Sequence, residues 1–339
     1  MNQSTTTLTA FGLLSSFVLA GTVAVETSKP VPVACADGFA QARRPISNPT
    51  LFDLALPTTN IHPIFMYQGL PDRVTTAGGG SLPVGGDFEV YALQFEYALN
   101  ERLSIVATKD GYVDLNPDRT LSSETGFANI AAGLKYAFIL DPATGTALSG
   151  TASFEFPTGN SDVFQGEGDG AVNLILSGLK LIDKWQFAGG LGVEIPFSDE
   201  QATNGWLSAH ASYEICKYFI PLVEVNWFHV IDEGDGVGNF PKQVGGAVPA
   251  AVNFEGSDLL NLGATNAGDN RDLVTAAFGF RSRLTDAIDI GAAYELPLTD
   301  DESSLMKERV TVASFGNSNW FVRSVCGVSP RILTFWRET

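Results

Sequence analysis

Serine, histidine and glutamate recur at every second position of one segment, and they are the residue types of a hydrolase. Ser208, His210, Ser212 and Glu214 alternate with small or apolar residues. A nucleophilic serine needs a base within hydrogen-bond reach, and a third group must orient that base. Same-face residues two apart on a strand are about 6.6 Å apart, so we expect no such hydrogen bond without a partner from another strand. With no G-x-S-x-G sequence in the chain, a polar stripe is the better interpretation, and a lipid hydrolase with His210 as base is a lesser hypothesis.

Acidic residues gather in three predicted loops, and carboxylate oxygens are suitable ligands for Ca²⁺ or Mg²⁺. The groups are Asp162, Glu167 and Asp169; Asp232, Glu233 and Asp235; and Asp300, Asp301 and Glu302. None has the spacing of an EF-hand loop, so solvated loops are the better interpretation. The second group, in the longest loop, is kept as a candidate cation site. The three histidines show no metal-binding spacing to a cysteine, and no cofactor motif is evident.

A larger set of charged side chains falls on one face of alternating segments. Its members are Glu96, Lys135, Glu155, Glu194, Glu214, Glu224, Arg281, Arg283, Asp289 and Glu295. If this face lines a barrel lumen, the charges coordinate water and bias which ions pass. Alternatively, they form cross-strand pairs that fill a closed interior. Acidic residues outnumber basic ones in the set, so an open lumen should prefer cations.

The elements that must position these side chains are strands, because apolar residues recur with a period of two. Between Glu89 and Leu99, for example, every odd position after Glu89 is aromatic or leucine. We expect about twelve strands of roughly ten residues, the length that a tilted membrane-spanning strand needs. They are predicted near 60–68, 88–99, 103–113, 126–140, 146–157, 170–182, 185–197, 205–216, 218–230, 272–284, 287–298 and 305–315.

The predicted connections alternate between short and long. The short ones are 100–102, 141–145, 183–184, 217 and 285–286, and the long ones are 69–87, 114–125, 158–169, 198–204, 231–271 and 299–304. A membrane barrel with periplasmic termini has tight turns on the periplasmic side and longer loops outside. A soluble β-sandwich, the competing interpretation, has no reason to sort its loops in this way. The longest loop, 231–271, could fold inward as a constriction.

A closed barrel also explains the aromatic residues that gather near strand ends, such as Trp185, Trp206 and Trp227, because amphipathic rings favour the membrane interface. Hydrocarbon offers no hydrogen-bond partners, so strands can span it only if the sheet closes. The sequence therefore predicts an all-β fold, an antiparallel transmembrane β-barrel, with outer-membrane lipid against its apolar face.

Composition agrees with this class and excludes others. The 339 residues include 38 acidic and 20 basic side chains, a net charge of −18. Such a chain repels phosphate backbones, so we expect no nucleic-acid partner. Charged residues make up 17%, against roughly 25% in soluble domains. Three cysteines exclude a disulfide framework as the main stabilising feature.

The N-terminus resembles a targeting signal. Residues 8–25 are mostly apolar or small and carry no charge, as in the apolar region of a secretory signal. A signal anchor, or a lipoprotein modified at Cys35, are the lesser alternatives. We predict a signal peptide and short leader over 1–36, a periplasmic segment over 37–59, the barrel over 60–315 and an atypical tail over 316–339.

One predicted hairpin and two further strand segments carry a resemblance to a known family. The first strand contains the sequence Gly133-Leu134-Lys135-Tyr136, and a short Pro-containing turn follows it. The second strand ends with Phe156-Pro157-Thr158-Gly159. The likeness continues through residues 189–197 and 218–227. The chain resembles, over roughly 60–312, an outer-membrane family of transporters of a phenol meta-cleavage pathway. The resemblance implies a β-barrel in the outer membrane of a diderm bacterium and supplies no catalytic or ligand residue.

The C-terminus departs from that pattern. Barrels of this kind end on a strand with a final aromatic residue, which the barrel-assembly machinery recognises. Here that strand would be Met306 to Phe315, followed by a tail to Thr339 with three arginines and one acidic residue. Either the tail caps the barrel from the periplasm, or the reading frame changes near Ala313.

The sequence therefore predicts a non-enzymatic outer-membrane barrel that passes small molecules passively. The family name suggests apolar or aromatic solutes. The main alternative is a closed structural or adhesive barrel whose acidic loops bind cations or partners.

Overall fold

The computed structural model describes residues 37–75, 80–235, 241–243, 258–265, 267–268, 270–300 and 304–317. The predicted signal peptide and leader, 1–36, and all but the first two residues of the predicted tail, 316–339, lie outside these residues. Among the described residues, no helix has the length and apolar character to cross a membrane.

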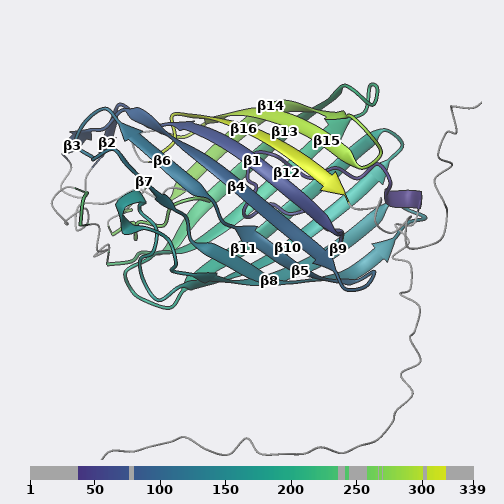
Figure 1. Cartoon of the computed structure of the whole chain (residues 1–339), viewed down its shortest axis with the longest axis horizontal. Coiled ribbons are helices and arrows are strands. Elements are labelled where there is room, and N and C mark those ends of the chain that lie inside the picture. The colour runs from purple at the N-terminus through teal and green to yellow at the C-terminus, as the bar shows by residue number, and fades with distance from the viewer. Residues whose placement is uncertain are drawn as a thin grey trace, which may run out of the picture. The chain divides into compact units, whose positions relative to one another are not determined.

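Twelve antiparallel strands close into a barrel, which confirms the predicted all-β fold. Closure is made by β1 (Asn60–Gly69), which pairs with β4 (Gly86–Ala98) on one side and with β16 (Glu308–Asn317) on the other. Figure 1 shows β1 between these two strands. The others are β5 (Leu103–Lys109), β8 (Ile130–Asp141), β9 (Thr146–Phe156), β10 (Ala171–Ile182), β11 (Trp185–Pro196), β12 (Thr203–Tyr213), β13 (Ile220–Asp232), β14 (Asp272–Arg283) and β15 (Ile288–Pro297).

Two of the predicted strands are interrupted. The strand predicted over 103–113 is β5 followed by β6 (Tyr112–Pro117), and the one predicted over 126–140 is β7 (Glu124–Phe127) followed by β8. Between β5 and β6, Gly111 has a φ of +135°, which side-chain-bearing residues rarely adopt. The carboxylate of Asp110 there accepts a hydrogen bond of 2.9 Å from the Leu93 N–H. A side chain thus replaces a neighbouring strand as the partner of that backbone group.

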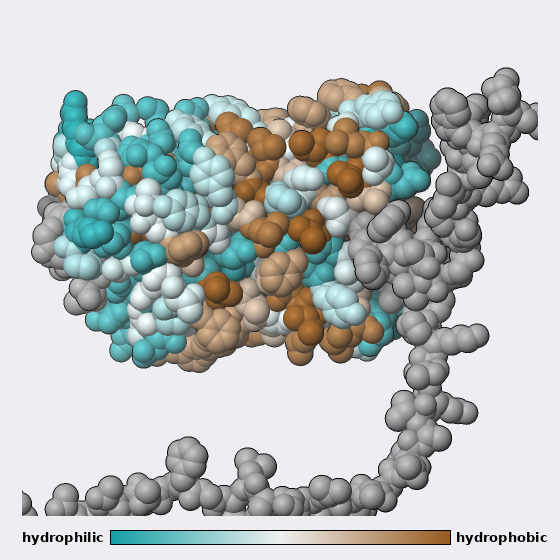
Figure 2. Space-filling model, in the orientation of Figure 1, coloured by the Kyte–Doolittle hydropathy of each residue, from teal (hydrophilic) through white to brown (hydrophobic). Residues whose placement is uncertain are grey.

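The outer surface of the barrel wall is apolar. On β4, for example, Tyr91, Leu93, Phe95 and Tyr97 are 49–60% exposed, while Gln94 and Glu96 between them are buried. Figure 2 shows apolar residues spread over the strands, with hydrophilic residues gathered at the end that carries β2 (Arg73–Thr75) and β3 (Ser81–Pro83). Because a soluble protein rarely exposes so large an apolar surface, this face is suited to lipid.

The connections between the strands lie at the two ends of the barrel. We call the end with residues 99–102, 142–145, 183–184, 214–219 and 284–287 the short-turn end, and the other the long-loop end. The connection 214–219 is longer than predicted. It has the same length as the connection 197–202 at the long-loop end, so short and long connections alternate less strictly than the sequence suggested. The long-loop end also carries the β2–β3 hairpin and the 3₁₀ turn η2 (Ser161–Val163).

Residues 37–59, the inner segment, lie inside the barrel, whereas we expected a periplasmic segment. It begins with the 3₁₀ turn η1 (Asp37–Phe39), where Gly38 lies against the backbone of Pro142 at the short-turn end. Further along, Ile46 and Phe52 are fully buried, and Phe52 packs where Gly190 leaves room on β11. The polar inner wall supplies partners for its backbone, as the hydrogen bond of 3.1 Å from Trp206 Nε1 to the Leu51 carbonyl illustrates.

The described part of the longest connection also folds inward, as the sequence suggested. Asp258, Leu259 and Leu260 are buried, and the Thr50 hydroxyl donates a hydrogen bond of 3.1 Å to the Asp258 carbonyl. The loop therefore contacts the inner segment directly.

Candidate functional site

The ten predicted lumen residues all lie on the inward side of the wall, at different depths. Six are buried: Glu96, Lys135, Glu155, Glu224, Arg281 and Glu295. The other four are half-buried: Glu194, Glu214, Arg283 and Asp289. Six of them contact the inner segment or the inward-folded loop: Glu96, Lys135, Glu194, Glu214, Glu224 and Arg281. The lumen residues thus bind this chain's own segments in the described conformation.

One cluster joins the inner segment to β4 and β8. Lys135 Nζ lies 2.5 Å from an Asp53 carboxylate oxygen and 3.0 Å from Glu96 Oε2, while Arg44 Nη1 lies 3.3 Å from the other Asp53 oxygen. Glu96 also accepts a hydrogen bond of 3.1 Å from the Thr58 N–H. Burial by itself would raise the pKa of Asp53, but Lys135 and Arg44 together hold it below its usual value. The cluster therefore needs an ionised Asp53.

A second cluster has the connectivity of a catalytic triad. His210 Nε2 lies 2.9 Å from Ser212 Oγ, and His210 Nδ1 lies 2.7 Å from Glu224 Oε1. The expectation that a serine two residues away is out of reach was wrong, because the two side chains lean toward each other along β12. The acid is Glu224 of the neighbouring strand, while Glu214 instead contacts Arg43 and Arg283.

The inner segment covers this cluster. Glu224 accepts backbone N–H groups of Ile46 at 3.0 Å and of Ser47 at 2.7 Å. Ser212 and His210 are each at most 3% exposed, and neither lines the two cavities described below. Through Glu224, this cluster anchors the inner segment.

A third cluster, which the sequence analysis missed, centres on Arg309 of β16. Its guanidinium lies 2.8 Å from Asp258 of the inward-folded loop, 2.8 Å from Gln68 and 3.5 Å from Glu295, and it donates to the Ser47 carbonyl at 3.3 Å. Arg309 and Asp258 are buried. Arg309 was detectable, since it alternates with Val310 and Val312 and shares a face with Thr311 and Ala313. Asp258 lies in a loop without periodicity and gave no such signal.

Arg43 anchors the start of the inner segment at the short-turn end. Its guanidinium lies 3.5 Å from Glu214, and its backbone N–H donates at 2.7 Å to Gln186 of β11. Burial lowers the pKa of Arg43 to about 10, although Glu214 opposes that shift. Arg43 therefore stays positively charged at neutral pH. Nearby, Arg281 pairs with Asp289 and donates at 3.3 Å to the Pro45 carbonyl.

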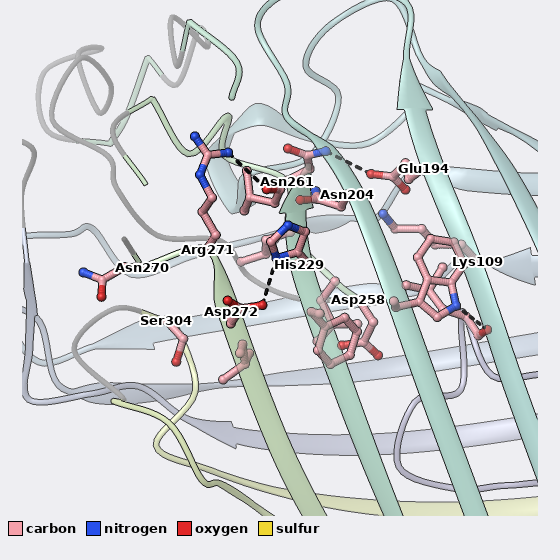
Figure 3. Close-up of a pocket in the computed structure, with 17 residues that line it drawn as sticks. Lys109, Glu194, Asn204, His229, Asp258, Asn261, Asn270, Arg271, Asp272 and Ser304 are labelled. Atoms are coloured by element: carbon pink, nitrogen blue, oxygen red, sulfur yellow. Dashed lines mark hydrogen bonds and ion pairs between the residues drawn. The ribbon is translucent and has the colours of Figure 1, made fainter. Parts of the chain in front are cut away.

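Among the cavities that the described residues line, two lie beside these clusters at the long-loop end. The first, of about 640 Å³, is polar at its rim and is drawn in Figure 3, where His229 contacts Asp272 and Asn261 contacts Glu194. The second, of about 590 Å³, is lined mostly by apolar side chains of β1, β4 and β6. Lys109, Leu259 and Leu260 line both. The two cavities therefore adjoin across the inward-folded loop.

The candidate cation site in the longest loop does not assemble as a ligand set. Glu233 lies 2.6 Å from Arg271, Asp232 is exposed, and the Asp235 N–H donates at 2.6 Å to the Asp199 carbonyl. Among the described residues, no three His, Cys, Asp or Glu side chains come together in a way that could hold a metal ion.

Comparisons with known proteins agree with the architecture. A family model described as "Putative MetA-pathway of phenol degradation" matches residues 71–281, more than half of the chain. The COG4313 outer membrane channel from Pseudomonas putida F1 has a similar fold, with a TM-score of 0.53 and 13% identity over 76% of this chain and 95% of that one. The NanC porin aligns at a TM-score of 0.45 and 7% identity, over 76% of this chain and 98% of that one. No curated protein sequence matches this chain.

Proposed function

Because the chain belongs to the family of the MetA pathway of phenol degradation, we propose that it is a passive channel for small molecules in an outer membrane, described here in a closed conformation. Export through the N-terminal signal and assembly by the barrel-assembly machinery of a diderm bacterium are part of this proposal. The apolar outer face and the polar inner clusters support it.

The observation that carries the proposal is the backbone inside the barrel. The side chains of an eight-stranded barrel are enough to fill its interior. Here the twelve-stranded wall encloses residues 37–59 as well as its own inward side chains. Hydrogen bonds and ion pairs, such as those of Arg43 and Asp53, hold the described part of this segment. If the segment moves aside, the wall itself leaves room for a solute.

The closed structural barrel is the alternative, and it predicts that the inner segment never leaves. A hydrolase has less support, because Ser212 is buried and Glu224, the acid of its cluster, accepts the backbone N–H groups of Ile46 and Ser47. Both alternatives can be tested together with the channel.

The test is conductance of the purified full-length protein in a planar bilayer, compared with the variant Arg43→Gln/Asp53→Asn. This variant weakens two anchors of the inner segment without altering the wall. We expect brief, infrequent openings for the native protein and a clear increase in open time for the variant. Exchange of Lys217, an exposed residue of a short turn, for Gln is the matched control and should change nothing. A persistent absence of openings in both proteins, with the barrel folded, would overturn the channel.

A further inference from the structure

The wall binds the inner segment mainly through its backbone. The side chain of Gln186 on β11 makes two hydrogen bonds to Arg43: its oxygen accepts the N–H at 2.7 Å, and its amide nitrogen donates to the carbonyl at 2.6 Å. Glu224 on β13 accepts the N–H groups of Ile46 at 3.0 Å and Ser47 at 2.7 Å. These bonds involve main-chain groups, which any peptide can offer.

Two arginines of the wall bind carbonyl groups of the same stretch. Arg281 on β14 donates to the Pro45 carbonyl at 3.3 Å. Arg309 on β16 donates to the Ser47 carbonyl at 3.3 Å. All four of these wall side chains are at most 1% exposed. Residues 43–47 are therefore held at six main-chain atoms by buried side chains, and main-chain hydrogen bonds are what gives a peptide its affinity in many recognition sites.

Two side chains of this stretch also have matching partners on the wall. Ile46 is fully buried beside Leu222 and packs where Gly291 on β15 leaves room, since a Cβ there would lie 2.6 Å from Ile46 Cδ1. Three positions earlier, the Arg43 guanidinium lies 3.5 Å from Glu214. The wall therefore offers one place for an aliphatic side chain and one for a cation.

The four polar wall groups lose these partners when the inner segment moves aside. Buried polar and charged groups without hydrogen bonds are costly, and an apolar solute has no group that could replace the segment. A peptide backbone replaces all of the lost bonds at once. The predicted lumen set contains more acidic than basic residues, so a basic peptide is attracted more strongly than an acidic one.

We propose that the wall around residues 43–47 is a binding site for a short basic peptide that carries a cationic residue three positions before an aliphatic one. The inner segment is then the chain's own ligand and excludes other peptides while it is in place. The inference rests on the proposed channel function, since the site becomes free only when the segment moves aside. A tethered segment has a roughly millimolar effective concentration, so a free peptide competes well only when the anchors of the segment are weakened.

The test is binding of a fluorescently labelled peptide of residues 41–49 to the full-length variant Arg43→Gln/Asp53→Asn in lipid nanodiscs, measured by fluorescence anisotropy. We expect saturable binding to this variant. The native protein should bind the peptide at least roughly tenfold more weakly, because its intact segment competes for the same site.

Backbone N-methylation of the peptide tests how it is bound. Methyl groups on the nitrogens of Ile46 and Ser47 remove the two donors to Glu224 and keep every side chain, and we expect at least roughly tenfold weaker binding. N-methylation at Ala42 is the matched control and should have no such effect. The Ala42 N–H bonds to the Phe39 carbonyl within the segment itself, and the peptide does not contain that carbonyl.

A second peptide separates a general peptide site from one that takes only another copy of the inner segment. It keeps the residues equivalent to Arg43, Pro45 and Ile46 and has alanine elsewhere. We expect its affinity to lie within roughly tenfold of the first, because main-chain bonds and two side chains carry the recognition. Binding of the first peptide alone would overturn the proposed ligand class and leave only copies of this segment.

A matched pair of wall variants tests the site from the other side. Gln186→Leu, added to the same variant, removes both hydrogen bonds to the Arg43 backbone and should weaken binding of the peptide. Ser149→Ala is the control, at a buried position of β9 whose hydroxyl has no hydrogen-bond partner among the described residues. A heat-dependent shift in gel mobility checks that each barrel is folded. The comparison of N-methylated peptides needs no change in the wall and decides the matter if Gln186→Leu does not fold.

Failure of this site and failure of the channel give different results. No saturable binding to the folded variant, or equal affinity for the peptide methylated at Ile46 and Ser47, would overturn the site even if the protein conducts ions. Binding that depends on those two N–H groups, in a protein without any conductance, would support the site and count against the channel.

Discussion

At the scale of single residues, Lys135 holds two carboxylates that would otherwise repel each other. It is fully buried between Asp53 and Glu96. Replacing it with Met leaves both acids buried without their shared cation, and losing one member of a buried ion pair costs about 3–5 kcal/mol. We expect Lys135→Met to lower the temperature at which the barrel loses its folded gel mobility. Lys217→Met, at an exposed position, is the control, and equal temperatures for both variants would contradict the role given to Lys135.

Asp53 makes the inner segment sensitive to acid. Its pKa in the folded protein is held below its usual value by Lys135 and Arg44 against the effect of burial. Because the pKa of Asp53 is lower in the folded than in the unfolded protein, its ionised carboxylate stabilises the folded state. This stabilisation is fully present at pH values above the unfolded pKa of about 3.9. It is lost as the pH falls through the folded pKa. Proteolysis near Arg43 should therefore increase below about pH 4 in the native protein. In the Asp53→Asn variant, proteolysis should be faster at pH 7 and depend less on pH. Parallel pH profiles of proteolysis in the native protein and the variant would contradict the role of Asp53 as an anchor.

At the scale of elements, the inner segment is the part that would have to move for the proposed channel to open. The Asn226 amide on β13 donates a hydrogen bond of 2.9 Å to Ser47 Oγ, so cysteines at these two positions can be joined by a short bis-methanethiosulfonate, which forms a reducible disulfide with each. In a background with Cys35, Cys216 and Cys326 replaced by Ser, we expect this Ser47→Cys/Asn226→Cys link to abolish conductance until it is reduced.

The matched control joins two wall strands. Ser149 and Ser177 face each other across β9 and β10 and are both buried inside the barrel. Linking Ser149→Cys to Ser177→Cys leaves the inner segment free, and conductance should persist. Full conductance with the Ser47–Asn226 link in place would show that ions do not need the segment to move.

The strands, unlike the inner segment, could be predicted from the sequence. Because lipid lies on one side of the wall and a polar lumen on the other, apolar and polar side chains alternate along each strand. This pattern makes the strand bounds predictable: the strand predicted over 185–197 differs from β11 by one residue. The break at Asp110 and Gly111 was missed because it depends on one backbone conformation. Residues 37–59 have no periodicity, and their partners lie far away in the chain, such as Glu224 for Ser47. The predicted lumen charges lie inside, but their pairing with this segment was not predictable.

At the scale of the whole molecule, closure depends on one seam between the first and last strands. β1 pairs with β16 from Asn60 opposite Asn317 to Gly69 opposite Glu308. A chain that ends at Asn317 keeps this seam and should retain a heat-dependent shift in gel mobility. A chain that ends at Lys307 lacks β16 and should aggregate, because open strand edges cannot be satisfied in hydrocarbon. Loss of the shift in the longer chain would show that residues beyond Asn317 are needed for folding.

The charge of the whole chain bears on what passes through an open barrel. The net charge is −18, and the predicted lumen set contains more acidic than basic residues. When the inner segment leaves, it removes Arg43 and Arg44 from the lumen, along with Asp53, so the wall that remains is predominantly acidic. An acidic lumen favours cations, and a salt gradient across the bilayer should give a reversal potential of cation-preferring sign. Glu194→Gln/Glu214→Gln should move that potential toward zero, while Asp141→Asn at the short-turn end of β8 should not. An anion preference in the native protein would contradict this view of the lumen.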